Sequence, residues 1–153
     1  MTTVDELAEQ VPSLEDLLFS AVVPCWNNGA DKITAATAMT LLVAPIPVRI
    51  LSVSLSFEYW SLAAWDVAYW KMELNHGDAI AGYTTFATRT TQITGANANG
   101  GIVARKAWTF DAAAWGSADL AAGELLRMTV TPVGSPASDF DMPFTATVRY
   151  RPL

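Results

Sequence analysis

Strict alternation between apolar and polar side chains dominates this chain from Ile33 onward. In the run of residues 51–59, every second residue is large and apolar, and each residue between them is Ser or Glu. Successive side chains of a β-strand point to opposite faces, so a period of two gives each strand one buried face. No window after Ile33 sustains the 3.6-residue period of a helix beyond one turn. The pattern therefore predicts a body that is mainly β.

The same alternation recurs along the chain at intervals typical of an all-β domain. Residues 69–74, 126–131 and 142–151 repeat it clearly, and residues 33–36, 39–44, 83–93 and 102–110 repeat it more weakly. Turn-forming Gly, Asn and Pro separate these segments. Seven or eight antiparallel strands at this spacing predict a jelly-roll-like β-sandwich. The side chains predicted to be buried are Leu51, Val53, Leu55, Phe57, Met128, Val130, Phe144 and Val148.

Residues 1–31 differ from the rest and are predicted to be an acidic helical arm, with residues 32–153 as the sandwich domain. Thr3 with Glu6, and Ser13 with Asp16, have the form of helix-capping boxes. We expect the apolar side chains of two short helices either to bind a partner or subunit, or to cover one end of their own sandwich. These candidate interface residues are Val4, Leu7, Leu14, Leu17 and Leu18.

Charge is unevenly divided between the two parts. The chain has a formal net charge of −6, and residues 1–31 contain six acids and no Lys or Arg, whereas the remaining nine acids and nine bases balance. Nucleic-acid-binding proteins concentrate Lys and Arg on one face. The distribution therefore disfavours DNA or RNA as a partner.

The sequence also predicts the compartment in which the chain folds. Cys25 is the single cysteine, so the chain has no internal disulfide. The N-terminus lacks the basic start and apolar run of a secretory signal, and no stretch reaches the roughly 18 apolar residues of a membrane-spanning helix. We expect a soluble protein that folds in a reducing cytoplasm, with no membrane partner.

Residues that carry chemistry are few. His76 is the only histidine and has no Gly-x-Ser-x-Gly motif to accompany it. Asp139 and Asp141, with the distant Asp78, are the best candidate metal ligands, yet acids in loops are usually solvated turn residues. We therefore expect no enzymatic activity, no catalytic or metal site and no cofactor.

Six tryptophans are the main compositional oddity, in a chain that is 52% hydrophobic and only 16% charged, against about 25% charged in a typical protein. Trp70 and Trp108 occupy strands and are predicted to be core. Trp60, Trp65 and Trp115 fall at strand ends or in Ala-rich loops, where they are candidates for the core, a subunit interface or a ligand platform. Low charge and surplus Trp together predict a closed homo-oligomer.

The C-terminal strands carry a family resemblance. Residues 121–136, AAGELLRMTVTPVGSP, and residues 142–152, MPFTATVRYRP, resemble the closing strands of small virion proteins of tailed bacteriophages. The resemblance covers roughly residues 33–153 and is closest to head decoration or minor capsid proteins. It implies a β-sandwich on the outside of the capsid, bound to the major capsid protein, with a trimer as the first expectation and a dimer as the second. It also implies no enzymatic activity and no cofactor.

Two alternatives from other functional classes stay open at this point. A carbohydrate- or receptor-binding module of a phage fibre or tail would use loop tryptophans together with acids and amides on one face. A small β-barrel enzyme or ligand carrier would need a deep cavity lined with polar groups.

Overall fold

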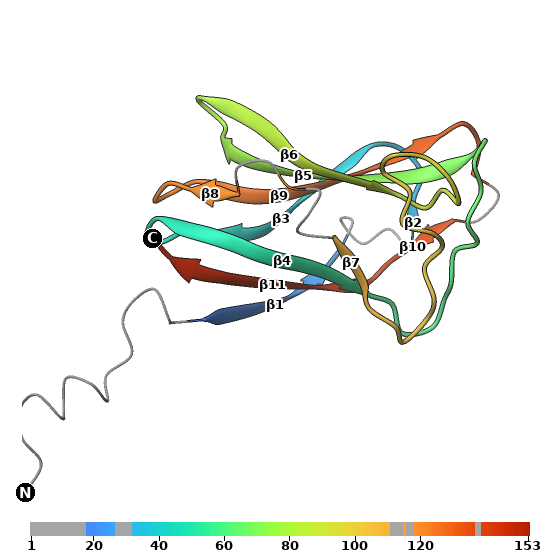
Figure 1. Ribbon diagram of the computed structural model, residues 1–153, viewed down its shortest axis with the longest axis horizontal. Helices are drawn as coiled ribbons and strands as arrows, with labels where there is room; N and C mark the ends of the chain where they lie inside the picture. The colour runs from blue at the N-terminus through green and yellow to red at the C-terminus, as the bar shows by residue number, and fades with distance from the viewer. Residues whose placement is uncertain (1–17, 27–31, 111–114, 116–117, 137–138) are drawn as a thin grey trace, which may run out of the picture.

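A computed structural model describes residues 18–26, 32–110, 115, 118–136 and 139–153. These residues form two antiparallel β-sheets that lie face to face (Figure 1). No helix in this part of the chain is long and apolar enough to cross a membrane. The prediction of a mainly β, antiparallel body is confirmed.

The first sheet has the strand order β1–β11–β4–β7, and the short strand β8 also pairs with β4. The second sheet has the order β3–β9–β5–β6, and a small ribbon joins β10 to β2. The bounds in chain order are β1 (Phe19–Cys25), β2 (Lys32–Ile33), β3 (Thr37–Val43), β4 (Val48–Ser56), β5 (Tyr69–Asp78), β6 (Gly82–Thr90), β7 (Trp108–Phe110), β8 (Asp119–Leu120), β9 (Leu125–Val133), β10 (Phe140–Asp141) and β11 (Phe144–Pro152).

The core lies between the two sheets and is built by the predicted alternation. Val53 of β4 is paired with Val148 of β11 and with Phe110 of β7, and all three side chains are buried. Seven of the eight side chains predicted to be core are buried. Burying this apolar surface stabilises the fold by roughly 25 cal/mol per Å² removed from water.

Leu51 is the exception, because the register between β4 and β11 shifts at that point. Arg149 is paired with Ser52 and Tyr150 with Ile50, which leaves Leu51 as the extra residue of a β-bulge. A bulge shifts the alternation by one residue. Ile50 therefore takes the buried position, and Leu51 is half-buried.

The first strand of the sandwich comes from the segment predicted to be an arm. Phe19–Cys25 pairs along its length with β11, and Ala21, Val23 and Cys25 alternate with more exposed residues. The helical structure predicted for residues 1–31 does not hold for Phe19–Cys25, because pairing with β11 satisfies the backbone of this segment and its alternate side chains face the core. Within the described part of the chain, the sandwich therefore includes Phe19–Cys25 as well as residues after 32. Residues 1–17 and 27–31 lie outside the described residues.

The fold predicts a sharp contrast between neighbouring positions of β4. Val53→Asp should lower the free energy of unfolding by about 4 kcal/mol or more, because it places an unpaired charge in a fully buried site. Ser52→Asp should change it by less than about 0.5 kcal/mol, because Ser52 lies opposite the exposed Arg149. Urea denaturation followed by circular dichroism measures both. Equal effects of the two substitutions would contradict this register.

Candidate interaction surface

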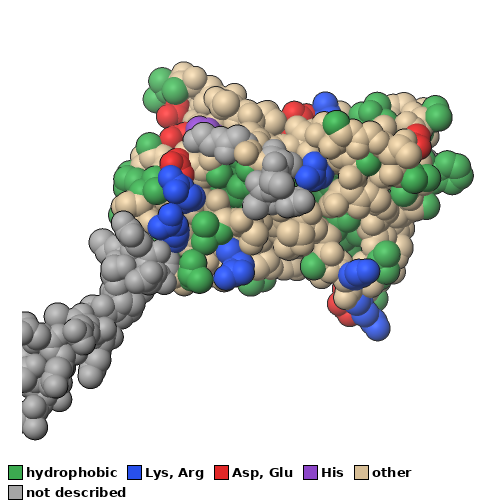
Figure 2. All heavy atoms as spheres, viewed as in Figure 1, with side chains coloured by type: hydrophobic (Ala, Val, Ile, Leu, Met, Phe, Trp, Pro, Cys, Tyr) green, Lys and Arg blue, Asp and Glu red, His purple; other side chains and the backbone are tan. Residues whose placement is uncertain are grey.

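Three apolar side chains from two connections are exposed together at the end of the sandwich where β2 and β10 lie. Trp65 and Val67 belong to the connection between β4 and β5, and Ile93 belongs to the connection between β6 and β7. All three are exposed, Val67 to 90%. We call Trp65, Val67 and Ile93 the loop patch. Figure 2 shows hydrophobic side chains on the surface at both ends of the body.

Asp66, between the first two members of the loop patch, connects the two segments. Its Oδ1 accepts hydrogen bonds from the backbone N–H groups of Ile93 and Thr94, each at 2.9 Å, and its Oδ2 accepts one from the Thr94 hydroxyl at 2.9 Å. The Trp65 N–H also donates to the Thr91 carbonyl at 3.3 Å. The hydrogen bonds from Thr94 and Ile93 lower the pKa of Asp66. The loop patch is therefore held in place before any partner binds.

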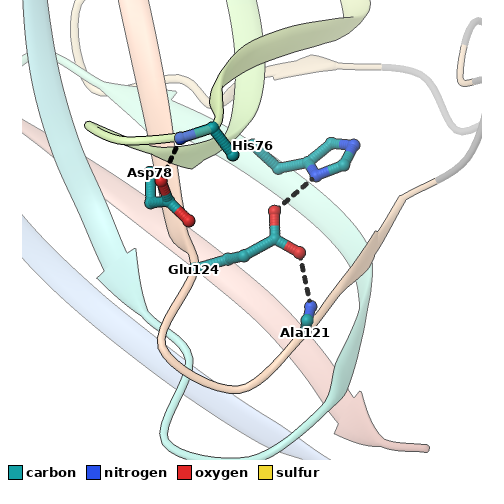
Figure 3. Close-up of polar contacts among 5 residues, drawn as sticks. His76, Asp78, Ala121 and Glu124 are labelled. Carbon is teal, nitrogen blue, oxygen red and sulfur yellow. Dashed lines mark hydrogen bonds and ion pairs between the residues drawn. The ribbon is translucent and has the colours of Figure 1, made fainter.

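A polar cluster lies at the opposite end of the sandwich, beside the turn that leads into β9 (Figure 3). Glu124 Oε2 is 3.0 Å from His76 Nδ1 on β5, and Glu124 Oε1 accepts a hydrogen bond of 2.8 Å from the Ala121 N–H. The hydrogen bond from His76, followed by that from Ala121, lowers the pKa of Glu124. Both carboxylate oxygens are occupied, so this pair fixes the turn against β5.

An ion pair lies at the same end. Arg49 of β4 holds Asp119 of β8 through two parallel hydrogen bonds, Nε to Oδ1 at 2.7 Å and Nη2 to Oδ2 at 2.9 Å. The bond from Arg49 lowers the pKa of Asp119. Such fork-shaped pairing is geometrically specific. It explains why the two-residue strand β8 stays registered on β4.

The tryptophans proposed from the sequence occupy different environments. Trp65 is exposed, whereas Trp60 and Trp115 are partly buried against the core. The Trp60 ring lies edge-on to Phe57, with centroids 4.0 Å apart, and Trp115 lies edge-on to Phe86 at 5.6 Å. The structure therefore places Trp65 in the loop patch and uses most of the other two rings for packing.

Most of the interface residues predicted for the N-terminal segment lie outside the described residues, namely Val4, Leu7, Leu14 and Leu17. Leu18 is exposed just before β1. Sequence reasoning did not select Val67, because it lies in an Ala-rich connection with no periodic signal. It did not select Ile93, because that residue was assigned to the predicted strand of residues 83–93, whereas β6 ends at Thr90.

The candidate catalytic and metal-binding residues have the following surroundings in the structure. Cys25 is buried, and this burial raises the pKa of its thiol to about 11. Asp78 accepts hydrogen bonds from the N–H groups of Ile80 and Ala81 in the β5–β6 turn. Among the described residues, no group of three or more His, Cys, Asp or Glu side chains is arranged to hold a metal ion.

Comparison with known proteins adds little to this description. No protein-family model and no curated protein matches the chain. A solved structure titled "Structure of infectious bursal disease virus Gx strain" aligns with 90% of this chain at 11% identity and a TM-score of 0.37. This chain spans about a third of that chain, 33%.

The Glu124 cluster predicts a pH-dependent contribution to stability. A carboxylate with a lowered pKa in the folded state contributes stability above its unfolded pKa, about 4.3, and loses it as the pH falls through the folded pKa. Glu124→Gln should therefore lower the melting temperature at pH 7 by an amount that corresponds to about 1 kcal/mol. The difference from the parent protein should shrink below about pH 4.

Differential scanning fluorimetry across pH 3 to 8 measures this difference. Glu58→Gln is the matched control, because Glu58 forms an exposed ion pair with Arg105 and should contribute little at any pH. A difference between Glu124→Gln and the parent protein that grows in acid would contradict the role assigned to Glu124.

Proposed function

We propose that this protein is a non-enzymatic structural protein of a tailed-phage virion, which decorates the capsid and bridges neighbouring subunits of the major capsid protein. The observation that carries the proposal is the loop patch of Trp65, Val67 and Ile93, which is exposed yet held in place by Asp66. Single exposed apolar side chains are common on monomeric proteins, whereas apolar side chains gathered in one patch often mark an interaction site. A surface that is ordered before binding loses little conformational entropy when it docks.

The strand order supports a more specific architecture, the jelly roll. Along the chain, β1 lies in the first sheet, β3 in the second, β4 in the first, β5 and β6 in the second, β7 in the first, β9 in the second and β11 in the first. This winding back and forth between a five-stranded and a four-stranded sheet supports a jelly roll, an architecture of viral capsid and lectin domains. Architecture alone does not assign a function, so it supports the proposal only together with the loop patch.

The segments that resemble phage virion proteins occupy central positions in the fold. Residues 121–136 contain β9, which lies between β3 and β5, and residues 142–152 contain β11, which lies between β1 and β4. The resemblance therefore falls on strands that organise both sheets. This placement supports a shared architecture for the whole body.

The proposed role needs contact area rather than catalytic groups. A protein that binds across two shell subunits favours the assembled state, because its binding free energy is gained only when the subunits lie together. Repetition over the shell, and a closed trimer or dimer of this chain, would multiply that effect. No cofactor, nucleic acid or membrane takes part in this proposal.

Immunogold electron microscopy tests the location of the protein. Antibody raised against the chain should label the heads of particles of the phage whose genome encodes it, because a decoration protein is repeated over the capsid surface. Labelling confined to fibre or tail tips would favour the receptor-binding alternative instead. Purified particles without label would contradict the virion assignment.

Self-association through the loop patch is tested separately by sedimentation. The protein should form a closed oligomer at tens of micromolar, and Val67→Asp should shift it to monomer, because burying an unpaired charge at an interface is unfavourable. Ile80→Asp is the control: Ile80 is 99% exposed at the tip of the β5–β6 hairpin, at the other end of the sandwich. Equal dissociation by both substitutions, or none by Val67→Asp, would contradict an interface at the loop patch.

A further inference from the structure

A continuous groove crosses the end of the sandwich beside the start of β11. It consists of two adjoining hollows, of about 410 Å³ and about 200 Å³, which share Glu58 and Pro143 in their walls. The larger hollow is bordered by Tyr59 and Trp60 after β4, and the smaller one by Trp26 after β1. We call this feature the Glu58–Pro143 groove. It is distinct from the loop patch, with which it shares no residue.

Aromatic rings form much of the wall of the groove. Tyr59 is 85% exposed and Trp26 is 60% exposed, so their ring faces are open to a ligand. Trp60, in contrast, is fixed by edge-on contacts with Phe57 and with Phe140, whose centroid lies 5.3 Å away. The groove therefore combines one immobile ring with two open ones. Large exposed rings in a preformed hollow are typical of ligand sites.

Polar groups lie between these rings. The Glu58 carboxylate is paired with Arg105, Oε1 to Nε at 3.2 Å, and Asp141 lines the same hollow from β10, opposite Lys32 of β2. The two acids thus provide planar hydrogen-bond acceptors. Arg105 offsets the charge of Glu58, and the Lys32 ammonium forms an ion pair with Asp139 at 3.0 Å.

We propose that the Glu58–Pro143 groove binds a neutral saccharide. Tyr59 and Trp26 stack on the C–H faces of sugar rings, and Glu58 and Asp141 accept hydrogen bonds from sugar hydroxyls. A saccharide has an apolar face and a rim of hydroxyls, and it therefore matches a groove in which open aromatic rings alternate with carboxylates. The carboxylates of Glu58 and Asp141 disfavour an anionic ligand, and the Arg105 guanidinium beside Glu58 disfavours a cationic one. Two adjoining hollows suit consecutive sugar residues of one chain.

This binding activity goes beyond a role in capsid assembly and does not depend on it. The loop patch carries the proposed assembly contact, whereas the groove remains open for a glycan. A virion protein with this groove would attach to a glycan surface as well as to its shell. The two proposals have separate residues and can fail separately.

The test uses the whole chain and a microarray of neutral glycans, followed by titration of the bound glycan with tryptophan fluorescence as the readout. Tyr59→Ala and Trp26→Ala should each weaken binding about tenfold or more, as loss of a stacking ring does. Both side chains are largely exposed, so the melting temperature should stay unchanged. Tyr59→Phe keeps the ring and should retain binding. Trp65→Ala, outside the groove, is the matched tryptophan control and should leave the affinity unchanged.

Three results would overturn the proposal. The first is an array on which no neutral glycan binds the parent protein. The second is binding that is lost in Trp65→Ala but retained in Tyr59→Ala, which would place the glycan on the loop patch. The third is binding of a polyproline peptide in place of any glycan, because aromatic grooves also accept that helix.

Discussion

The aromatic cluster around Phe140 is the contact on which the end of the sandwich with the loop patch and the groove depends. The fully buried Phe140 ring lies 5.4 Å, centroid to centroid, from Phe57, Trp70 and Phe144. Trp70 belongs to β5 and Phe144 to β11, so one ring links the two sheets. The connection that carries Trp65 and Val67 of the loop patch runs from Phe57 to Trp70, and both of these residues belong to the cluster. Trp60, which packs against the cluster, also lines the groove. Both proposed surfaces therefore rest on one rigid support.

The two ends of the sandwich are stabilised by different chemistry. The Arg49–Asp119 ion pair and the hydrogen bond between His76 and Glu124 hold the end that carries the β5–β6 hairpin. Aromatic packing around Phe140 holds the other end, where the ion pairs of Glu58 with Arg105 and of Lys32 with Asp139 lie at the surface. Both proposed binding surfaces fall at this end, because it combines the buried aromatic cluster with exposed apolar side chains from the connections around it.

Much of the fold could be predicted from local pattern, and the departures have physical causes. Val53, Leu55 and Phe57 are buried as the alternation predicted. The pattern failed at Leu51, where a bulge shifts the register, and at Tyr59, which is exposed because β4 ends at Ser56 and the chain turns. Trp65 was selected as a surface candidate from its loop position. Its neighbours in the loop patch were not, because their proximity depends on contacts between distant segments.

The sequence by itself determined that residues after Ile33 form strands with one buried face, because alternation is a local property of the chain. Only the tertiary structure decided which strands pair, since an antiparallel register joins residues far apart in sequence. It placed Asp66 against Ile93, 27 positions away, and brought Glu58 beside Pro143. Sheet stacking sets such contacts through packing of the whole core, and no local pattern encodes them.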